Sequence, residues 1–465
     1  MKVIASLGPS SSNIDVIERM VRAGANAFRI NFAHGDPEQW AKFVDMVRTV
    51  EARLGVPLAL IGDLRGPSIR IGLLERPILL NRGDVVRFVY AEQIKGDECA
   101  VPIPTKHFFE IVEVGDVIVM DDGKVRLRVV EKVGPEEIEA VAMTDARITS
   151  HKAVVIRGKD YELPTLSKDD LVSLEFALEH DFDYISLSYV RRPEDVELLR
   201  SILAKKGRSD VGVIAKIETK SAVENLEKIA DNADVVMVAR GDLGMNFNLE
   251  DIHFLQKYIV AKCLRKGKPV IVATQLLESM IENTVPTRAE VVDISVAVEQ
   301  GVDALMLTGE TSIGKHPVEA VSWLRRIADH VESRMDRELE LVIERARSRP
   351  MDIATRFAKG VVELAEDIGA KLVIFTMKGN TAKRIASLRP RIRVFAATPS
   401  IQVMRKLSIL WSLEPFYVEA ENYKEGLEKA LEVARSKGYV SIGDLVVRTY
   451  GLREAEHVIE VTRIE

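Results

Sequence analysis

The chain has 465 residues, of which 47% are hydrophobic and 29% charged, a balance typical of a globular protein of about two to four domains. Its formal net charge of −6 gives no electrostatic reason to bind nucleic acid or an acidic membrane, and no apolar run approaches the roughly 18–20 residues that span a bilayer. Its two cysteines match no zinc spacing and its opening residues do not resemble a signal peptide, so we expect a soluble cytoplasmic protein.

The first 66 residues alternate short apolar runs with amphipathic stretches. We predict strands at Val3–Leu7, Ala27–Phe32 and Leu58–Asp63. Between them, apolar residues recur at helical spacing in Asn13–Ala23 and Pro37–Leu54. This rhythm of strands and helices predicts a parallel sheet with helices packed against it.

The composition of the sequence changes after Gly66-Pro67, and residues 67–162 are rich in valine, glycine and aspartate. Apolar and polar residues alternate there in segments such as 84–89 and 124–129, and turn residues such as Gly134-Pro135 separate these segments. We therefore predict a small all-β domain inserted between units of the parallel sheet.

Strands and helices alternate again from residue 163 to residue 338. Five further strands are predicted at Tyr184–Ser188, Gly212–Ile217, Asp234–Ala239, Pro269–Ala273 and Ala304–Leu307. Helical patterns separate them, at Val223–Ala230, Ile252–Lys266 and Val318–Val331 among others. Together with the first three, these strands reach the eight that close a (β/α)₈ TIM barrel. On rhythm alone a doubly wound sheet is the alternative.

A charged helical stretch at 329–349 leads into a last predicted domain at 339–465. Strands are predicted there at Leu372–Thr376, Val394–Ala397, Pro415–Val418 and Leu445–Arg448, with helices between them. The predicted fold is therefore of the α/β class: a catalytic barrel formed by 1–66 and 163–338, a β lid, and a smaller C-terminal α/β domain for regulation and oligomerisation.

Reactive side chains of such a barrel belong at the C-terminal ends of its strands. Lys216 and Glu218 are two residues apart at one such end, so they share a face of the strand. One interpretation is an ammonium that stabilises a phosphoryl group beside a carboxylate that binds a metal ion. The alternative is a structural ion pair that fills the mouth of the barrel.

Further polar residues follow the other strands. Asp242 offers a hard oxygen ligand for magnesium, and the neighbouring Gly241 lets the backbone turn and expose its N–H to an anion. Arg29 in the second strand needs an anionic partner, because an unpaired buried charge is costly. Asp63 and Thr274 end two more strands, and His34 is either a base or a loop cap.

These groups place cations and carboxylates around one barrel mouth, an arrangement that suits phosphoryl transfer, where catalysis is mainly positioning and charge neutralisation. The sequence contains no Walker A motif and no kinase glycine-rich loop, so the common nucleotide-binding motifs are absent from it.

Several longer motifs occur in the order typical of pyruvate kinases. They are Ser6–Ser10 (SLGPS), Arg29–Gly35 (RINFAHG), Asp63–Arg70 (DLRGPSIR), Ala215–Thr219 (AKIET), Ala239–Gly244 (ARGDLG), Ala273–Met280 (ATQLLESM), Pro286–Glu290 (PTRAE) and Leu307–Thr311 (LTGET). The chain thus resembles pyruvate kinases along essentially its whole length. The resemblance implies the last step of glycolysis, in which the phosphoryl group of phosphoenolpyruvate passes to ADP and gives pyruvate and ATP.

The resemblance also implies a role for each site residue. Lys216 and Arg29 would hold the phosphoryl group, and Thr274 would help to protonate the enolate carbon through water. The substrate carboxylate would bind the backbone N–H groups near Gly241. Magnesium or manganese would be held by Glu218 and Asp242, and the substrate would also contact Asp242. The nucleotide would contact Arg70, Lys168, Asn31 and His34, beneath a lid that excludes water.

The chain departs from the family pattern where potassium would bind. Members that need potassium carry a serine where this chain has Ala33 and a glutamate where it has Ser68. A monovalent site at Asn31 and Asp63 would therefore lack a hydroxyl ligand and an acidic neighbour, so we expect activity independent of potassium. Arg65 replaces the usual lysine and keeps its charge.

The resemblance continues through the C-terminal domain, at 405–411 and 443–447. Regulated members bind a sugar phosphate in a loop of this domain, and a homotetramer is typical of the family. The corresponding loop offers Thr376, Lys378 and Thr381 to an effector phosphate, and a plain loop at a helix start is the alternative. The segment that usually covers the effector is short here, at 449–453, so activation by fructose 1,6-bisphosphate is not expected.

Two other functions remain as alternatives. One is a different barrel enzyme that handles phosphoenolpyruvate or pyruvate, such as a mutase or a class II aldolase. Such an enzyme has no reason to carry the β insertion and the C-terminal domain. The other is a catalytically silent scaffold, which would be free to lose Lys216, Glu218, Asp242 and Thr274.

Overall fold

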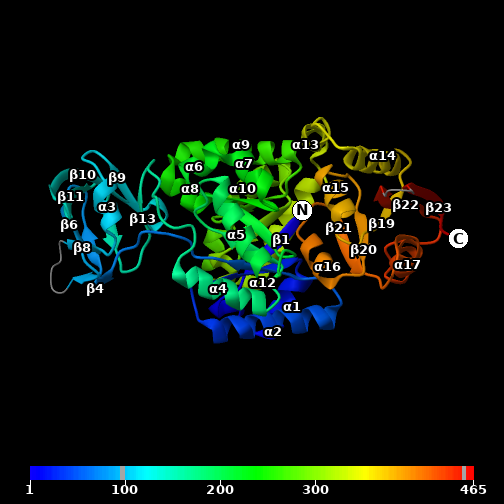
Figure 1. The fold of residues 1–465 in the computed structure, drawn as a ribbon, viewed down its shortest axis with the longest axis horizontal. Coiled ribbons are helices and arrows are strands. Elements are labelled where there is room, and N and C mark those ends of the chain that lie inside the picture. The colour runs from blue at the N-terminus through cyan, green and yellow to red at the C-terminus, as the bar shows by residue number, and fades with distance from the viewer. Residues whose placement is uncertain (95–99, 453–456) are drawn as a thin grey trace.

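The computed structural model describes residues 1–94, 100–452 and 457–465. A β domain, a central barrel and a C-terminal α/β domain lie in a row along the long axis of the molecule (Figure 1). The barrel strands are parallel and close on themselves in the order β1 (Lys2–Ser6), β18 (Ala304–Leu307), β17 (Val270–Ala273), β16 (Val235–Ala239), β15 (Gly212–Ile217), β14 (Tyr184–Leu187), β3 (Ala59–Asp63) and β2 (Ala27–Asn31). Closure confirms the predicted TIM barrel and excludes the doubly wound sheet, which is open.

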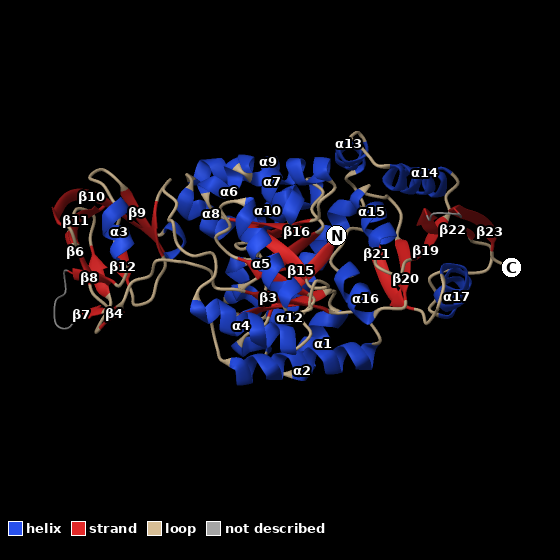
Figure 2. Cartoon of the chain, viewed as in Figure 1, coloured by secondary structure: helices blue, strands red, loops and turns tan. Residues whose placement is uncertain are grey.

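Helices surround the barrel strands (Figure 2). They are α1 (Ile14–Arg22), α2 (Pro37–Leu54), α4 (Lys168–Glu179), α5 (Pro193–Lys205), α6 (Lys220–Glu224), α7 (Leu226–Asn232), α8 (Arg240–Asn246), α9 (Ile252–Lys266), α10 (Arg288–Glu299), α11 (Gly309–Ser312) and α12 (Pro317–Glu332). The bounds of α2 and α9 are those predicted. The single helix predicted at Val223–Ala230 is instead two short helices that meet at Asn225.

The bounds of α2 illustrate why some helices could be predicted accurately. The side chain of Asp36 accepts a hydrogen bond from the backbone N–H of Gln39 and caps the first turn, and Pro37 occupies the first helical position. At the other end, Gly55 adopts a left-handed conformation with φ of 63°, which ends the helix. Both signals are local in the sequence.

The β domain contains a sheet in the order β13 (Val154–Ile156), β9 (Val117–Met120), β10 (Val125–Gly134), β11 (Glu137–Ala142), β6 (Val85–Tyr90) and β8 (Ala100–Ile103). It also contains one short helix, α3 (Lys106–Ile111), which was not predicted. The helix buries Phe108 and Phe109 against the sheet, and its six residues are too short for a helical period to show in the sequence.

The C-terminal domain has a sheet in the order β21 (Leu413–Tyr417), β20 (Val394–Thr398), β19 (Lys371–Phe375), β22 (Leu445–Leu452) and β23 (His457–Arg463). Its helices are α13 (Asp336–Arg347), α14 (Ile353–Asp367), α15 (Asn380–Ser387), α16 (Ile401–Leu407) and α17 (Tyr423–Ser436). Strand β23 was not predicted. The predicted helical stretch at 329–349 is divided, because α12 ends at Glu332 and α13 begins at Asp336.

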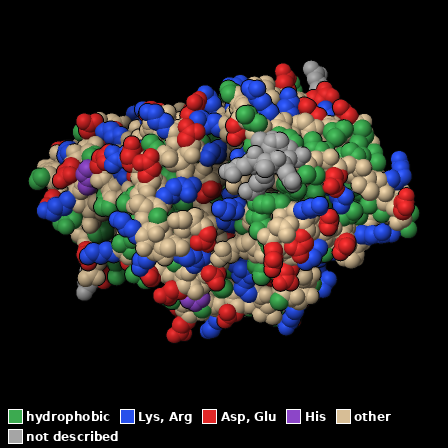
Figure 3. Space-filling model, turned by 45° about the vertical axis from the view of Figure 1, so that its right-hand side comes forward, with side chains coloured by type: hydrophobic (Ala, Val, Ile, Leu, Met, Phe, Trp, Pro, Cys, Tyr) green, Lys and Arg blue, Asp and Glu red, His purple; other side chains and the backbone are tan. Residues whose placement is uncertain are grey.

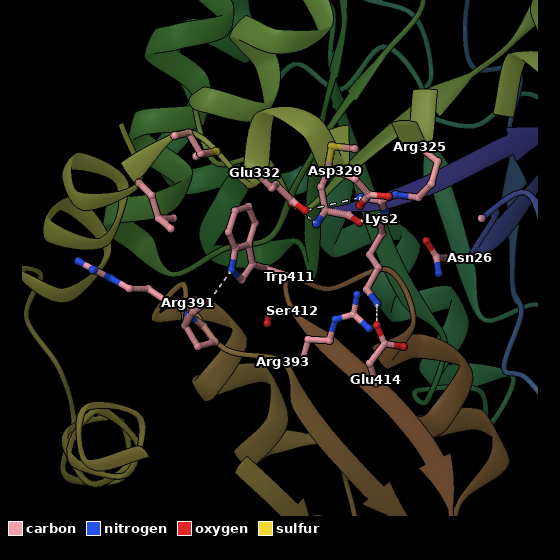
Figure 4. A pocket seen from close by; sticks show the side chains of 15 residues that line it. Lys2, Asn26, Arg325, Asp329, Glu332, Arg391, Arg393, Trp411, Ser412 and Glu414 are labelled. Carbon is pink, nitrogen blue, oxygen red and sulfur yellow. Dashed lines mark hydrogen bonds and ion pairs between the residues drawn. The ribbon is translucent and has the colours of Figure 1, made fainter. Parts of the chain in front are cut away.

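The C-terminal domain packs against the end of the barrel where the strands begin. Figure 4 shows Lys2 of β1 reaching Glu414 of β21, with 3.3 Å between Nζ and Oε1. The Tyr184 hydroxyl of β14 donates to the carbonyl oxygen of Lys406 at 2.9 Å. A cavity of about 380 Å³ remains at this junction, and most of the charged side chains around it are paired with one another.

On the molecular face in Figure 3, acidic and basic side chains are interspersed rather than gathered by sign. Within the described ranges, no helix is both long enough and apolar enough to cross a membrane.

Candidate active site

A polar cavity of about 240 Å³ lies at the opposite end of the barrel, where the strands end and the β domain meets them. Its lining combines residues of barrel strands β2, β3 and β15, of the segments that follow β2, β3, β14 and β16, and of the β domain. The polar and charged members are Arg29, Asn31, His34, Asp63, Arg65, Arg70, Asp121, Lys152, Ser188, Tyr189, Lys216 and Asp242. Parallel closure of the sheet brings these distant segments to one mouth.

Lys216, near the end of β15, is surrounded by acceptors. Its Nζ lies 2.8 Å from Oε1 of Glu218 and 3.7 Å from Oδ1 of Asp63, and it donates to the Ser188 hydroxyl at 2.8 Å. Burial favours the neutral amine, but the carboxylates of Asp63, Glu218 and Asp242 outweigh burial and raise the pKa of Lys216 above its ordinary value. Lys216 is therefore a permanently charged ammonium at the mouth of the barrel.

Asp63, at the end of β3, is the anionic partner that Arg29 needs. Arg29 Nε and Nη2 lie 2.7 and 2.5 Å from Asp63 Oδ2, and Arg29 Nη1 donates to the Ser6 hydroxyl at 3.1 Å. Burial alone would raise the pKa of Asp63, but Lys216 and Arg29 lower it below its usual range. Two cations thus share one buried carboxylate.

Glu218 and Asp242 are held by two shared partners. The backbone N–H of Tyr189 donates to Glu218 Oε2 at 2.8 Å, and the Tyr189 hydroxyl lies 3.5 Å from Asp242 Oδ1. The side-chain amide of Asn246 donates to the backbone carbonyls of Glu218 and Asp242 at 2.9 and 3.3 Å. Burial and the two carboxylates raise the pKa of Tyr189 well above its ordinary value, so its hydroxyl remains a donor.

The carboxylates of this mouth fit a divalent cation such as magnesium. Oε1 of Glu218 and Oδ1 of Asp63 are buried and accept no hydrogen bond from the described residues, and their ionic partner is the Lys216 ammonium at 2.8 and 3.7 Å. Among the described residues, no group of three or more His, Cys, Asp and Glu side chains forms a complete metal cage. Magnesium does not require one, since it commonly binds through one or two carboxylates and completes its shell with water and phosphate oxygens.

Thr274 follows strand β17 and lies beside the start of α8. Its hydroxyl accepts a hydrogen bond from the backbone N–H of Gly241 at 2.8 Å. The predicted substrate-binding N–H and the predicted proton-transfer hydroxyl are therefore in direct contact, although 33 residues separate them in the sequence.

The structure distinguishes between the residues predicted to bind the nucleotide. Arg70, Asn31 and His34 line the cavity. Lys168 does not: it begins α4, and its side chain is exposed to solvent. Sequence reasoning missed Lys152 of the β domain, which lines the cavity and pairs with Asp121 at 2.5 Å. The alternation of apolar and polar residues in a strand does not indicate which exposed lysine will contact another domain.

His34 lies in a strongly positive surrounding. Burial, followed by the charges of Arg29, Arg70 and Arg65, lowers the pKa of His34 below its ordinary value. Nearby, Oδ1 of Asn31 accepts a hydrogen bond from the backbone N–H of Ala33 at 3.1 Å, so part of its acceptor capacity is already used. Because its pKa is lowered, the His34 imidazole is neutral at neutral pH, as a base or a hydrogen-bond acceptor requires.

The predicted effector loop connects β19 with α15. Thr376 is buried, Lys378 is exposed, and the hydroxyl of Thr381 donates to the backbone carbonyl of Tyr450 at 3.1 Å. Of the short segment 449–453, residue Arg453 lies outside the described residues. Phosphate binding by this loop remains a prediction.

Two family models match the chain. The model described as "Pyruvate kinase, barrel domain" matches residues 1–321, and the model described as "Pyruvate kinase, alpha/beta domain" matches residues 356–464. The pyruvate kinase of Pyrobaculum aerophilum is 42% identical over 99% of this chain and 96% of its own length. The pyruvate kinase of Aeropyrum pernix is 36% identical over 100% of this chain and 99% of its own length.

Two solved structures of pyruvate kinases also match the fold of this chain. The crystal structure of pyruvate kinase from Pyrobaculum aerophilum has a TM-score of 0.87 and 41% identity, and the match covers 99% of each chain. A pyruvate kinase structure from Cryptosporidium parvum has a TM-score of 0.92 and 30% identity, and the match covers 100% of this chain and 96% of that one.

Proposed function

The chain belongs to the pyruvate kinase family of phosphotransferases, and we propose that its barrel mouth transfers the phosphoryl group of phosphoenolpyruvate to ADP with a divalent cation. The observation that carries this proposal is the position of Lys216. Its ammonium is held charged by Asp63 and Glu218 in a cavity that two domains line. Such a fixed charge, shielded from water, stabilises a phosphoryl group in transfer.

Arg29 and Lys216 would act on the phosphoryl group together. In this structure Arg29 pairs with Asp63 at 2.5 Å, and Lys216 pairs with Glu218 at 2.8 Å and lies 3.7 Å from Asp63. A substrate phosphate in this cavity would offer the two cations further anionic oxygens. The site is thus charged and oriented before the substrate arrives, and little reorganisation is needed in the transition state.

Glu218 and Asp242 would hold magnesium or manganese. When bound, the cation would neutralise charge on the phosphate and on the developing enolate oxygen. The protein's own part is to fix the two carboxylates through Tyr189, and the backbone that carries them through Asn246. The backbone N–H of Gly241 would bind the substrate carboxylate, beside the Thr274 hydroxyl that it contacts in this structure.

The β domain would exclude water from the transfer. It contacts the barrel through the segment Asp121–Gly123, which packs on α8, and through Val119 and Val155, which pack on Met245. Lys152 would carry its charge from this domain to the phosphates of the nucleotide, beside Arg70. Excluding water directs the phosphoryl group to ADP rather than to hydrolysis.

We also propose that the reaction needs no potassium. Asp63 is already neutralised by Arg29 and Lys216, and Ala33 supplies no hydroxyl ligand. The homotetramer, the cytoplasmic location and the effector phosphate at Thr376, Lys378 and Thr381 remain predictions from the family resemblance.

The test is pyruvate formation from phosphoenolpyruvate, ADP and magnesium by the unmodified protein and by Lys216→Met. We expect robust turnover that falls at least about 10³-fold in the variant, because the charge acts mainly in the transition state. The matched control is Lys220→Met, which removes an exposed lysine four residues away in α6 and should retain full turnover. Absence of turnover by the unmodified protein, with either magnesium or manganese, would refute the proposal and favour the mutase and aldolase reactions.

A further inference from the structure

Arg240, the first residue of α8, is a buried arginine that contacts the loop after β17. Its side chain is only 6% exposed. Nη2 donates to the backbone carbonyls of Thr274 and Gln275, both at 2.8 Å, and Nε donates to the carbonyl of Thr274 at 3.2 Å. One guanidinium therefore binds two successive carbonyl groups at the point where the barrel strand ends.

These two carbonyls belong to an unusual piece of backbone. Thr274 has φ of 71° and Gln275 has φ of 52°, so two consecutive residues other than glycine adopt the left-handed conformation. L-residues disfavour this conformation, and they keep it only where the surrounding structure holds them in it. The carbonyl contacts from Arg240 are polar interactions that hold the backbone of this turn.

The turn also sets the position of the Thr274 hydroxyl. That hydroxyl accepts the N–H of Gly241, the residue directly after Arg240. Two adjacent residues of α8 thus hold Thr274 from both sides: Arg240 binds its carbonyl oxygen, and Gly241 binds its side chain. A shift of the turn would move the hydroxyl with it.

Arg240 is in turn fixed by side chains outside the cavity. Nη1 lies 2.6 Å from Oδ2 of Asp293 in α10, and 3.5 Å from Oε1 of Gln256 in α9. Gln256 donates to the side chain of Gln300 at 2.9 Å. A planar guanidinium can donate to Asp293 and to two carbonyls at once, whereas the single nitrogen of a lysine cannot span these three acceptors.

We propose that Arg240 is a positioning residue that holds the left-handed turn at Thr274–Gln275 and thereby places the Thr274 hydroxyl for protonation of the enolate. This inference rests on the proposed function, in which Thr274 assists that step. The inference assigns different residues to the two steps of the reaction, phosphoryl transfer and protonation of the enolate. Lys216 and Arg29 serve phosphoryl transfer, and Arg240 serves proton transfer without touching the substrate.

The two parts can be measured separately because their atoms differ. In the first, the bond between phosphorus and the enol oxygen breaks as an oxygen of ADP attacks, which leaves ATP and the pyruvate enolate. In the second, the electron pair of the enolate takes a proton at carbon 3, delivered from water through the Thr274 hydroxyl, and pyruvate forms. The second step can be measured alone in heavy water. Its reversal removes a methyl proton from pyruvate, and protonation of the enolate then adds deuterium.

The experiment compares the unmodified enzyme with Arg240→Lys and Asp293→Asn, each with magnesium. Deuterium exchange into pyruvate is followed by proton nuclear magnetic resonance in the presence of ATP, and ATP formation in the first turnover is followed by rapid quenching. We expect Arg240→Lys to slow exchange by about 10- to 100-fold, the loss that follows from misplacing a reacting group by about 1 Å. First-turnover ATP formation and KM for phosphoenolpyruvate should change less than about threefold.

Asp293→Asn keeps the inference testable if Arg240→Lys folds poorly. It leaves the guanidinium in place but removes its ionic partner, so exchange should slow in the same selective way by a smaller factor. The matched control is Arg200→Lys. Arg200 likewise donates to a backbone carbonyl, that of Asn232 at 2.6 Å, and pairs with Asp234 at 2.8 Å, but it lies at the other end of the strands. This variant should exchange at the unmodified rate.

Three outcomes would overturn the inference. Exchange could be unchanged in Arg240→Lys, exchange and first-turnover ATP formation could fall by the same factor, or Arg200→Lys could show the same selective loss. Failure of the proposed function is recognised separately, since then the unmodified enzyme itself forms no pyruvate. A crystal structure of Arg240→Lys gives a readout independent of activity: we expect Thr274 to leave its left-handed conformation, and an unchanged turn would count against the proposal.

Discussion

Arg389 of the C-terminal domain and Asp303 of the barrel form a fully buried ion pair, with 2.9 Å between Nη1 and Oδ1 and 2.5 Å between Nη2 and Oδ2. The Asp303 carboxylate also accepts the backbone N–H groups of Val270 at 2.9 Å and Trp411 at 3.0 Å. Because Val270 begins barrel strand β17 and Trp411 lies in the C-terminal domain, this carboxylate joins the two domains at the end of the barrel opposite the candidate active site.

Breaking this pair should strongly destabilise the protein. In Asp303→Asn the charge of Arg389 stays buried without its partner, a change that costs about 3–5 kcal/mol. The free energy of unfolding, from denaturant titration followed by circular dichroism, measures the loss. Glu340→Gln is the control, because its pair with Arg391 at 3.4 Å is exposed and should contribute less than about 1 kcal/mol. Equal small losses in both variants would contradict the prediction.

Glu218→Gln should weaken divalent-metal binding. Removing one ligand charge should lower the affinity for manganese by at least about 10-fold, a loss that even indirect partners of a metal can cause. Titration of free manganese by electron paramagnetic resonance measures this affinity without any turnover. The control is Glu278→Gln, a half-exposed carboxylate whose nearest cation is Lys124 at 3.9 Å. Unchanged manganese affinity in Glu218→Gln would exclude Glu218 as a ligand.

Lys152 and Lys168 can be distinguished by the affinity for ADP. Lys152 lines the cavity and Lys168 does not, so Lys152→Met should raise KM for ADP by about 10-fold or more, the value of one charged hydrogen bond. Lys168→Met should change it less than about twofold. Initial rates at saturating phosphoenolpyruvate give both values. The reverse ranking would restore Lys168 as the nucleotide contact.

The rate should not depend on potassium. Arg29 and Lys216 already neutralise Asp63, so a monovalent cation there would add repulsion rather than a missing charge. The check is the initial rate of pyruvate formation in tetramethylammonium buffer with and without added potassium. A rise of about tenfold or more would show that the cation is needed despite this charge balance.

Asp183 should make stability depend on pH. Burial raises its pKa to about 6, although Arg48 at 3.1 Å and the N–H of Leu60 at 2.8 Å partly oppose the rise. The folded state therefore binds this proton more tightly than the unfolded state, where the pKa is near 3.8. The resulting stabilisation is complete below about pH 4 and is lost as the pH rises to about 6, a change of about 3 kcal/mol for this group.

The measurement compares the unmodified protein with Asp183→Asn between pH 4 and pH 7. Relative to the variant, the unmodified protein should lose unfolding free energy up to about pH 6 and then level off. Parallel curves for the two proteins would show that Asp183 does not titrate in this range.

The positions of the barrel strands and of the well-capped helices could be predicted from the sequence, because their signals are local. Runs such as Val235–Ala239 are apolar on both faces because a parallel strand in a barrel is buried on both sides. Lys216, Glu218, Asp242 and Thr274 could be predicted as site residues for a related reason: a polar residue at the end of an apolar strand stands out, and the barrel gathers all such ends at one mouth.

The partners that these residues meet depend on the packed fold and could not be predicted. Nothing local in the sequence joins Arg240 to the carbonyl of Thr274, Asn246 to that of Glu218, or Arg389 to the side chain of Asp303. The position of Lys152 could not be predicted either, because Lys152 lines the cavity only when the β domain packs against α8. Local signals arise from a residue's own helix or strand, whereas these contacts join residues that lie far apart in the chain and meet only after the strands have closed and the domains have packed.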